Sequence, residues 1–151
     1  MSGQGYIVPQ QLLRLAIEKA SDDQAQRLEA CLELLTEVDQ LERTFPARLE
    51  EARAKAGIES PRLSKAATEA VAESSTAARE IDRLLHRRCN RATTAGEIVR
   101  ELLAVAREDM KSAAFLAREA PDEPSREILE ELYDKKRDVV ERLKGFVATN
   151  P

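Results

Sequence analysis

The apolar residues of this chain recur every three or four positions over most of its length, which is the period of one helical face. The first, short stripe consists of Leu12, Leu13, Ala16 and Ile17. Pro9 suits the first turn of this helix, because that turn does not use the N–H that proline lacks. We therefore predict an irregular N-terminal arm over residues 1–8 and a helix over residues 9–20.

A longer apolar stripe begins at Leu28 and continues without interruption through Pro46. Ser21 and Gln24 have the spacing of a capping box, in which a side chain and a backbone N–H satisfy each other at a helix start. Because the period continues through Pro46, we predict one long helix that is kinked there. Gly57 is a typical helix end signal.

Three further helices are expected in the remainder of the chain. Pro61 favours the start of the third helix. Thr94 and Glu97 have the capping-box spacing again and predict the start of a fourth, which ends before Pro121. A last apolar stripe occupies residues 128–146.

The short connections between these helices make sequential neighbours antiparallel. We predict an all-α fold, an up-and-down four-helix bundle with a short extra N-terminal helix, as one domain over residues 9–151. The composition agrees with this fold class. Apolar residues make up 42%, charged residues 34% and aromatic residues 3% of the chain, a mixture that favours helices over strands.

The net charge of −4 argues against a protein that coats nucleic acid over its whole surface, but it leaves room for one basic face. No apolar run approaches the ~18 residues of a membrane span, so we expect no membrane partner. The first ten residues lack the charge and apolar stretch of a signal peptide. With two cysteines, these features predict a cytoplasmic protein with free thiols.

A basic cluster stands near the end of the predicted third helix. The residues concerned are Arg79, Arg83, Arg87, Arg88 and Arg91, together with Arg100 and Arg107 of the next helix. Guanidinium groups bind phosphate oxygens in bidentate fashion, so the cluster is compatible with the backbone of a nucleic acid. In the alternative interpretation, the cluster pairs with Glu29, Glu33 and Glu37 of the preceding helix.

Cys31, His86 and Cys89 form a second possible constellation. If the second and third helices are antiparallel about a turn near residue 58, all three residues lie within one helical turn. Glu97 or Glu101 could then supply a fourth zinc ligand. A disulfide is another alternative. Because no C-x-x-C pair is present, we expect these residues to be inert core or interface positions without a metal.

No catalytic apparatus is evident. The helix layout resembles that of ferritin-like carboxylate proteins, but those bind metal through Glu-x-x-His pairs. The corresponding stretch here reads Asp134-Lys135-Lys136-Arg137, and His86 is the only histidine. No phosphate-binding glycine loop is present either. We therefore expect no enzymatic activity and no cofactor.

The N-terminal segment is the best candidate for a contact with another protein. The residues concerned are Tyr6, Ile7, Val8, Leu12, Leu13 and Ile17. Four long helices already complete a bundle, so a fifth amphipathic helix either covers one end of that bundle or binds another chain.

These features favour a non-enzymatic helical subunit or adaptor that acts by protein–protein contacts in a larger assembly. The alternative is a small subunit that contacts the nucleic-acid backbone in a ribonucleoprotein. In size and architecture alone, the chain is similar to the helical small subunits of CRISPR effectors. In that case the basic cluster carries the function.

Overall fold

The computed structural model describes residues 9–58, 69 and 94–149. It contains the helices α1 (Pro9–Lys19), α2 (Asp22–Lys55), α4 (Ala95–Arg118) and α5 (Glu123–Thr149), and the described residues include no strand. The predicted all-α fold is thus confirmed at the level of packed helices. The predicted arm over residues 1–8 and the third helix from Pro61 lie outside the described residues.

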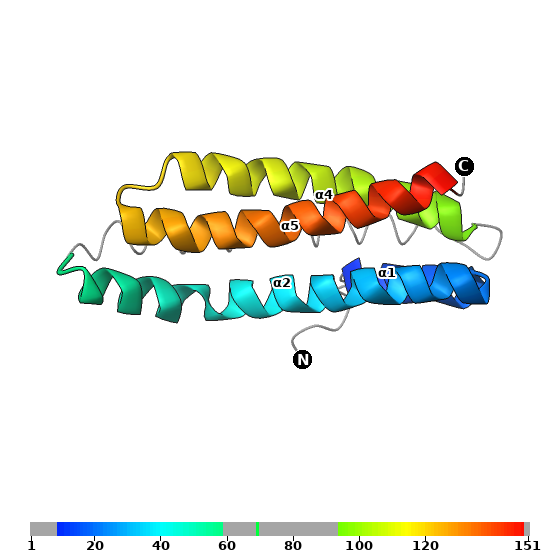
Figure 1. Ribbon diagram of the computed structural model, residues 1–151, viewed down its shortest axis with the longest axis horizontal. Coiled ribbons are helices and arrows are strands. Elements are labelled where there is room, and N and C mark those ends of the chain that lie inside the picture. Colours follow the sequence, from blue (N-terminus) through cyan, green and yellow to red (C-terminus); the bar gives the residue numbers. More distant parts are fainter. Residues whose placement is uncertain (1–8, 59–68, 70–93, 150–151) are drawn as a thin grey trace.

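Helices α2, α4 and α5 run along the long axis of the molecule (Figure 1). Helix α5 packs against both α4 and α2, and it is antiparallel to both. The short helix α1 packs against α2 and α4. Among the described helices, the backbones of α2 and α4 do not approach each other closely. Helix α5 and helix α1 therefore connect them.

Local side-chain chemistry determines where two of these helices begin, as the sequence predicts. The backbone N–H of Ser21 donates to Oε1 of Gln24 at 3.3 Å. At the start of α4, Oγ1 of Thr94 accepts from the backbone N–H of Glu97 at 3.2 Å. These contacts satisfy groups that the first turn of a helix cannot pair internally.

Helix α2 is continuous through Pro46, whose side chain is exposed, so the prediction of a single long helix is confirmed. It ends at Lys55, and Gly57, two residues further on, has a φ of +74°. The N–H of Ile58 donates to the carbonyl of Arg53, and the N–H of Gly57 donates to that of Ala54. This pair of bonds is a Schellman motif, which requires the left-handed conformation that glycine adopts without strain.

The apolar stripes of the four described helices meet in one core. The largest fully buried side chains include Phe45, Leu49, Ile98 and Phe146. The predicted stripes therefore identify the buried faces correctly. Phe115 of α4 is the exception among large apolar residues of the described segments, with 56% of its surface exposed.

Candidate functional site: a buried ion triad and an outer cleft

Most of the residues predicted to contact an anionic partner lie outside the described residues. These are Arg79, Arg83, Arg87, Arg88 and Arg91, and the same holds for Tyr6, Ile7 and Val8 of the arm. Arg100 and Arg107 lie on α4 and are exposed. Neither forms an ion pair with any residue in the described ranges, so both cations face solvent.

The apolar stripe of α1 lies within the core of the chain itself. Leu12 and Leu13 are almost completely buried, and Ile17 is half-buried against the same core. Helix α1 packs on α2 and α4, which corresponds to the alternative in which the extra helix covers the bundle. The surface that remains open on this helix is its polar side.

Cys31 is a buried free thiol on α2. Burial raises the pKa of this thiol to about 11, although the positive charge of Arg142 acts in the opposite direction. The thiol is therefore protonated at neutral pH and is a poor nucleophile and metal ligand. Its proposed partners His86 and Cys89 lie outside the described residues. Within the described residues, no three His, Cys, Asp or Glu side chains are grouped closely enough to hold a metal.

A buried lysine at the centre of the molecule connects three helices. Lys136 of α5 has only 4% of its side chain exposed. Its Nζ lies 2.8 Å from Oδ1 of Asp109 on α4 and 3.3 Å from Oε2 of Glu42 on α2. We call these three residues the ion triad. Because the backbones of α2 and α4 do not approach each other closely, the triad forms a polar connection between the two helices.

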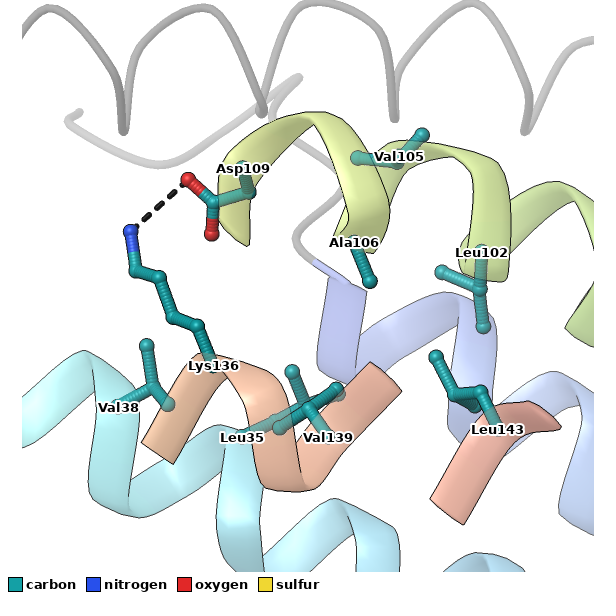
Figure 2. Close-up of a pocket in the computed structure, with 9 residues that line it drawn as sticks. All are labelled: Leu35, Val38, Leu102, Val105, Ala106, Asp109, Lys136, Val139 and Leu143. Atoms are coloured by element: carbon teal, nitrogen blue, oxygen red, sulfur yellow. Dashed lines mark hydrogen bonds and ion pairs between the residues drawn. The ribbon is translucent and has the colours of Figure 1, made fainter. Parts of the chain in front are cut away.

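Figure 2 shows Lys136 reaching across to Asp109 beside an apolar cavity of about 40 Å³. Leu35 and Val38 of α2 form one wall of this cavity. Leu102, Val105 and Ala106 of α4 line it from the other side, with Val139 and Leu143 of α5. A cavity of this size has space for a few water molecules at most, and it is far below the ~300 Å³ typical of small-molecule sites.

The electrostatics of the ion triad keep Lys136 charged. Burial by itself lowers the pKa of this ammonium group, but the charges and hydrogen bonds of Asp109 and Glu42 outweigh burial, and the net effect raises the pKa above 10.5. A lysine that acts as a base or nucleophile needs a lowered pKa. The ion triad is therefore suited to holding helices together and not to proton transfer.

A second buried ion pair connects α2 to the turn before α5. Nε of Arg53 lies 3.2 Å from Oδ2 of Asp122, and only 4% of the arginine side chain is exposed. The other carboxylate oxygen of Asp122 accepts from the backbone N–H of Ser125 at 2.9 Å. Burial acts to raise the pKa of Asp122, but the bonds from Ser125 and the charge of Arg53 lower it below 3.8 overall.

On the solvent side of α4 and α5, the two helices border a surface depression of about 400 Å³. We call it the α4–α5 cleft; it is lined by Ala114, Ala117, Arg118, Glu130, Tyr133 and Asp134. The three charged residues of the cleft are exposed, and none forms an ion pair with another described residue. The cleft thus differs from the interior, where Arg53 and Lys136 are both neutralised by carboxylates.

The sequence analysis missed the ion triad, the Arg53–Asp122 pair and the cleft. The triad did leave a signal. Lys136 lies four residues after Leu132 and three before Val139, so it occupies a core position of its stripe. Asp109 occupies the equivalent position between Val105 and Ala113. Charged residues at core positions indicate buried ion pairs, because an unpaired buried charge is too unfavourable.

Comparison with protein families, with curated proteins and with solved structures finds no match to this chain. None of the described helices combines the length and apolar character that a membrane span requires. The function must therefore be argued from the geometry of the chain.

Proposed function

We propose that this chain is a non-enzymatic helical subunit or adaptor that acts by protein–protein contacts within a larger assembly. The observation that carries this proposal is the α4–α5 cleft. Arg118, Glu130 and Asp134 present charges on its rim that no described side chain neutralises, and Tyr133 supplies an aromatic wall. Tyrosine and arginine are enriched in surfaces that recognise another protein, and the rims of such surfaces are polar.

The chemistry of the interior supports a binding role over catalysis. Cys31 is protonated because of its high pKa, and Lys136 is held as an ammonium ion by two carboxylates. The cavity next to Lys136 is too small for an organic substrate. Phe115 adds exposed apolar surface on α4, immediately after Ala114 of the cleft.

The alternative function, contact with a nucleic-acid backbone in a ribonucleoprotein, is favoured by one observation in the described residues. Arg100 and Arg107 are exposed on α4, and their spacing of seven residues places them on the same side of the helix. Their guanidinium groups are therefore available for phosphate oxygens.

A tagged copy purified from its native host tests both functions. We expect a complex that contains other protein chains in fixed ratio, measured by light scattering and mass spectrometry. With no tryptophan and two tyrosines, the chain absorbs weakly at long ultraviolet wavelengths, so bound nucleic acid would dominate the spectrum. A nucleic-acid spectrum that is lost on changing Arg100 and Arg107 to glutamate would favour the alternative. A monomer without partners would contradict both proposals.

A further inference from the structure

We propose that the α4–α5 cleft docks a partner helix that carries a stripe of basic residues, with one lysine or arginine of that helix inserted between Glu130, Asp134 and Tyr133. This inference rests on the proposed function and names the class of partner. It is carried by the shape of the cleft, by the charges on its walls and by the pattern of carboxylates along α5.

The shape of the cleft follows from residue size. Ala114 and Ala117 stand one turn apart on α4, and their short side chains leave space that faces Tyr133 on α5. The resulting depression of about 400 Å³ is large enough for a long side chain of a partner, which would lie against alanine methyl groups and the tyrosine ring. Long basic side chains suit such a site, because their stems are apolar and their ends are charged.

The charges on the cleft walls favour a cation. Glu130 and Asp134 are four residues apart, so they lie on the same side of α5, whereas Arg118 is the only cation of the lining. The Tyr133 ring already attracts a guanidinium group, since Cζ of Arg137 lies 6.0 Å from its centroid. A second cation approaching between the two carboxylates would gain from both the charge and the aromatic wall.

The cleft belongs to a longer acidic stripe on the solvent side of α5. The members recur every three or four residues and are Glu123, Glu127, Glu130, Asp134, Asp138 and Glu141. All are exposed, and the stripe extends along roughly 27 Å of helix at 1.5 Å per residue. Arg126 pairs with Glu123 and Lys144 with Glu141 at its two ends. Between these ends, Glu127, Glu130 and Asp134 make no ion pair with any described residue.

A helix with basic residues at the same three- and four-residue spacing matches this stripe along its length, since both helices have the same pitch. The same carboxylates oppose a nucleic acid, because phosphates would be brought next to uncompensated negative charge. The charge pattern therefore selects a basic protein segment over an RNA for this surface.

Two synthetic helical peptides test the inference with the full-length, isotope-labelled chain. One peptide carries lysines at positions i, i+4 and i+7 with leucines between them, and the other has glutamates in place of the lysines. We expect the basic peptide to shift the backbone amide resonances of Ala114, Ala117 and Tyr133, and the acidic peptide to leave them unchanged. Equal effects of the two peptides, or shifts by a short RNA at the same residues, would overturn the inference.

Matched variants distinguish the effect of the cleft on peptide binding from the effect of the net charge of the protein. Replacing Glu130 by Gln and Asp134 by Asn is expected to weaken binding of the basic peptide about tenfold. Replacing Glu29 and Glu33 on α2 by Gln removes the same total charge from exposed positions also four residues apart. This control should bind like the unmodified chain. Equal weakening in both variants would show that net charge alone is responsible and would overturn the inference.

A third variant tests the shape of the cleft without changing its charge. Ala114→Met fills the depression and is expected to weaken binding as strongly as loss of the two carboxylates. If Ala114→Met binds normally, the cleft is not the docking site. These results are independent of the native assembly. A chain that purifies with fixed protein partners in every variant contradicts the cleft but leaves the proposed function standing, whereas a chain without partners contradicts the proposed function.

Discussion

The substitution Lys136→Met is the sharpest test of the role assigned to the ion triad. Methionine has a similar length and fits an apolar site, so the change removes a charge with little loss of volume. Asp109 and Glu42 would then remain in the interior with 20% and 18% of their side chains exposed and with no ammonium group between them. We expect a large loss of stability, because two like charges lose their common partner.

The magnitude follows from the geometry. At an effective dielectric constant of about 20, a charge pair about 3 Å apart contributes about 5 kcal/mol of Coulomb attraction, which desolvation of the ions largely offsets. Removing one partner of a buried pair typically costs about 3–5 kcal/mol, since the remaining charge is left uncompensated. Because both carboxylates keep some contact with solvent, we expect the lower end, about 3 kcal/mol.

Urea unfolding followed by circular dichroism measures this loss as a lower midpoint at unchanged slope. The control is Lys135→Met, because Lys135 is adjacent but pairs with Glu37 at the surface. That variant is expected to unfold close to the unmodified chain. If Lys136→Met and Lys135→Met unfold at the same urea concentration as the unmodified chain, the ion triad does not hold the helices together.

The pH dependence of the difference in stability between the unmodified chain and Lys136→Met provides a second check. Because the folded protein raises the pKa of Lys136 above its ordinary 10.5, the stabilisation is fully present below that value and is lost as the pH rises through the folded-state pKa. The gap between the unmodified chain and Lys136→Met should therefore be constant from about pH 6 to pH 9 and shrink only in stronger alkali. A gap that closes below about pH 8 would contradict a raised pKa.

Three further predictions follow from individual residues. Gly57→Ala should lower the free energy of unfolding by about 1 kcal/mol in urea titrations, because its φ of +74° strains an alanine although nothing obstructs the added methyl group; unchanged stability would contradict the Schellman end. Asp122→Asn should be less stable than the unmodified chain above about pH 5. This difference in stability should vanish as the pH falls through the lowered pKa of Asp122. A difference that persists at about pH 2 would contradict the pairing with Arg53. In a Cys89→Ser background, Cys31 is the only thiol that can react with a disulfide reagent. It should react at least about a hundredfold more slowly in the folded chain than in urea, because burial raises its pKa to about 11. Equal rates would contradict the burial of Cys31.

Helix starts and ends were predictable because they depend on contacts within a few residues. Thr94 accepts a bond from the N–H three residues later, and Gly57 supplies the left-handed conformation that ends α2. In each case the residue type and the spacing contain the information. The apolar stripes were predictable for the same reason, since a period of 3.6 residues defines one face of a helix without reference to any other helix.

The ion triad was not predictable as a contact, although two of its members occupy core positions in their stripes. The sequence shows that Lys136 and Asp109 each replace an apolar residue in a stripe, and that Glu42 lies beside one, four residues after Val38. Whether they meet depends on how far each helix is shifted along its neighbours, and a shift of one turn moves a side chain by about 5.4 Å. That shift is fixed by packing across the whole core, which no local pattern specifies.

The cleft escaped the sequence analysis for a related reason. In the sequence, Ala114 and Ala117 are small apolar residues of α4, and Glu130 and Asp134 are charged residues of α5. Nothing in either helix alone indicates a depression. The depression exists because the antiparallel packing of α4 and α5 places small residues opposite Tyr133. A site made by two helices becomes visible only when their relative register is known.

The ion triad and the cleft are connected through that register. Lys136 is two residues from Asp134, and Asp109 is five residues from Ala114, so the triad lies within roughly 8 Å of the cleft along either helix. If the triad fixes the register of α5 on α4, replacing all three members by apolar residues of similar size should preserve stability and yet weaken binding of the basic peptide. The test is the triple variant that combines Lys136→Met, Asp109→Leu and Glu42→Leu. Urea unfolding measures its stability, and titration with the basic peptide measures its binding. Stability and binding that both match the unmodified chain would show that apolar packing alone sets the register, and that the buried charges have no part in shaping the surface above them.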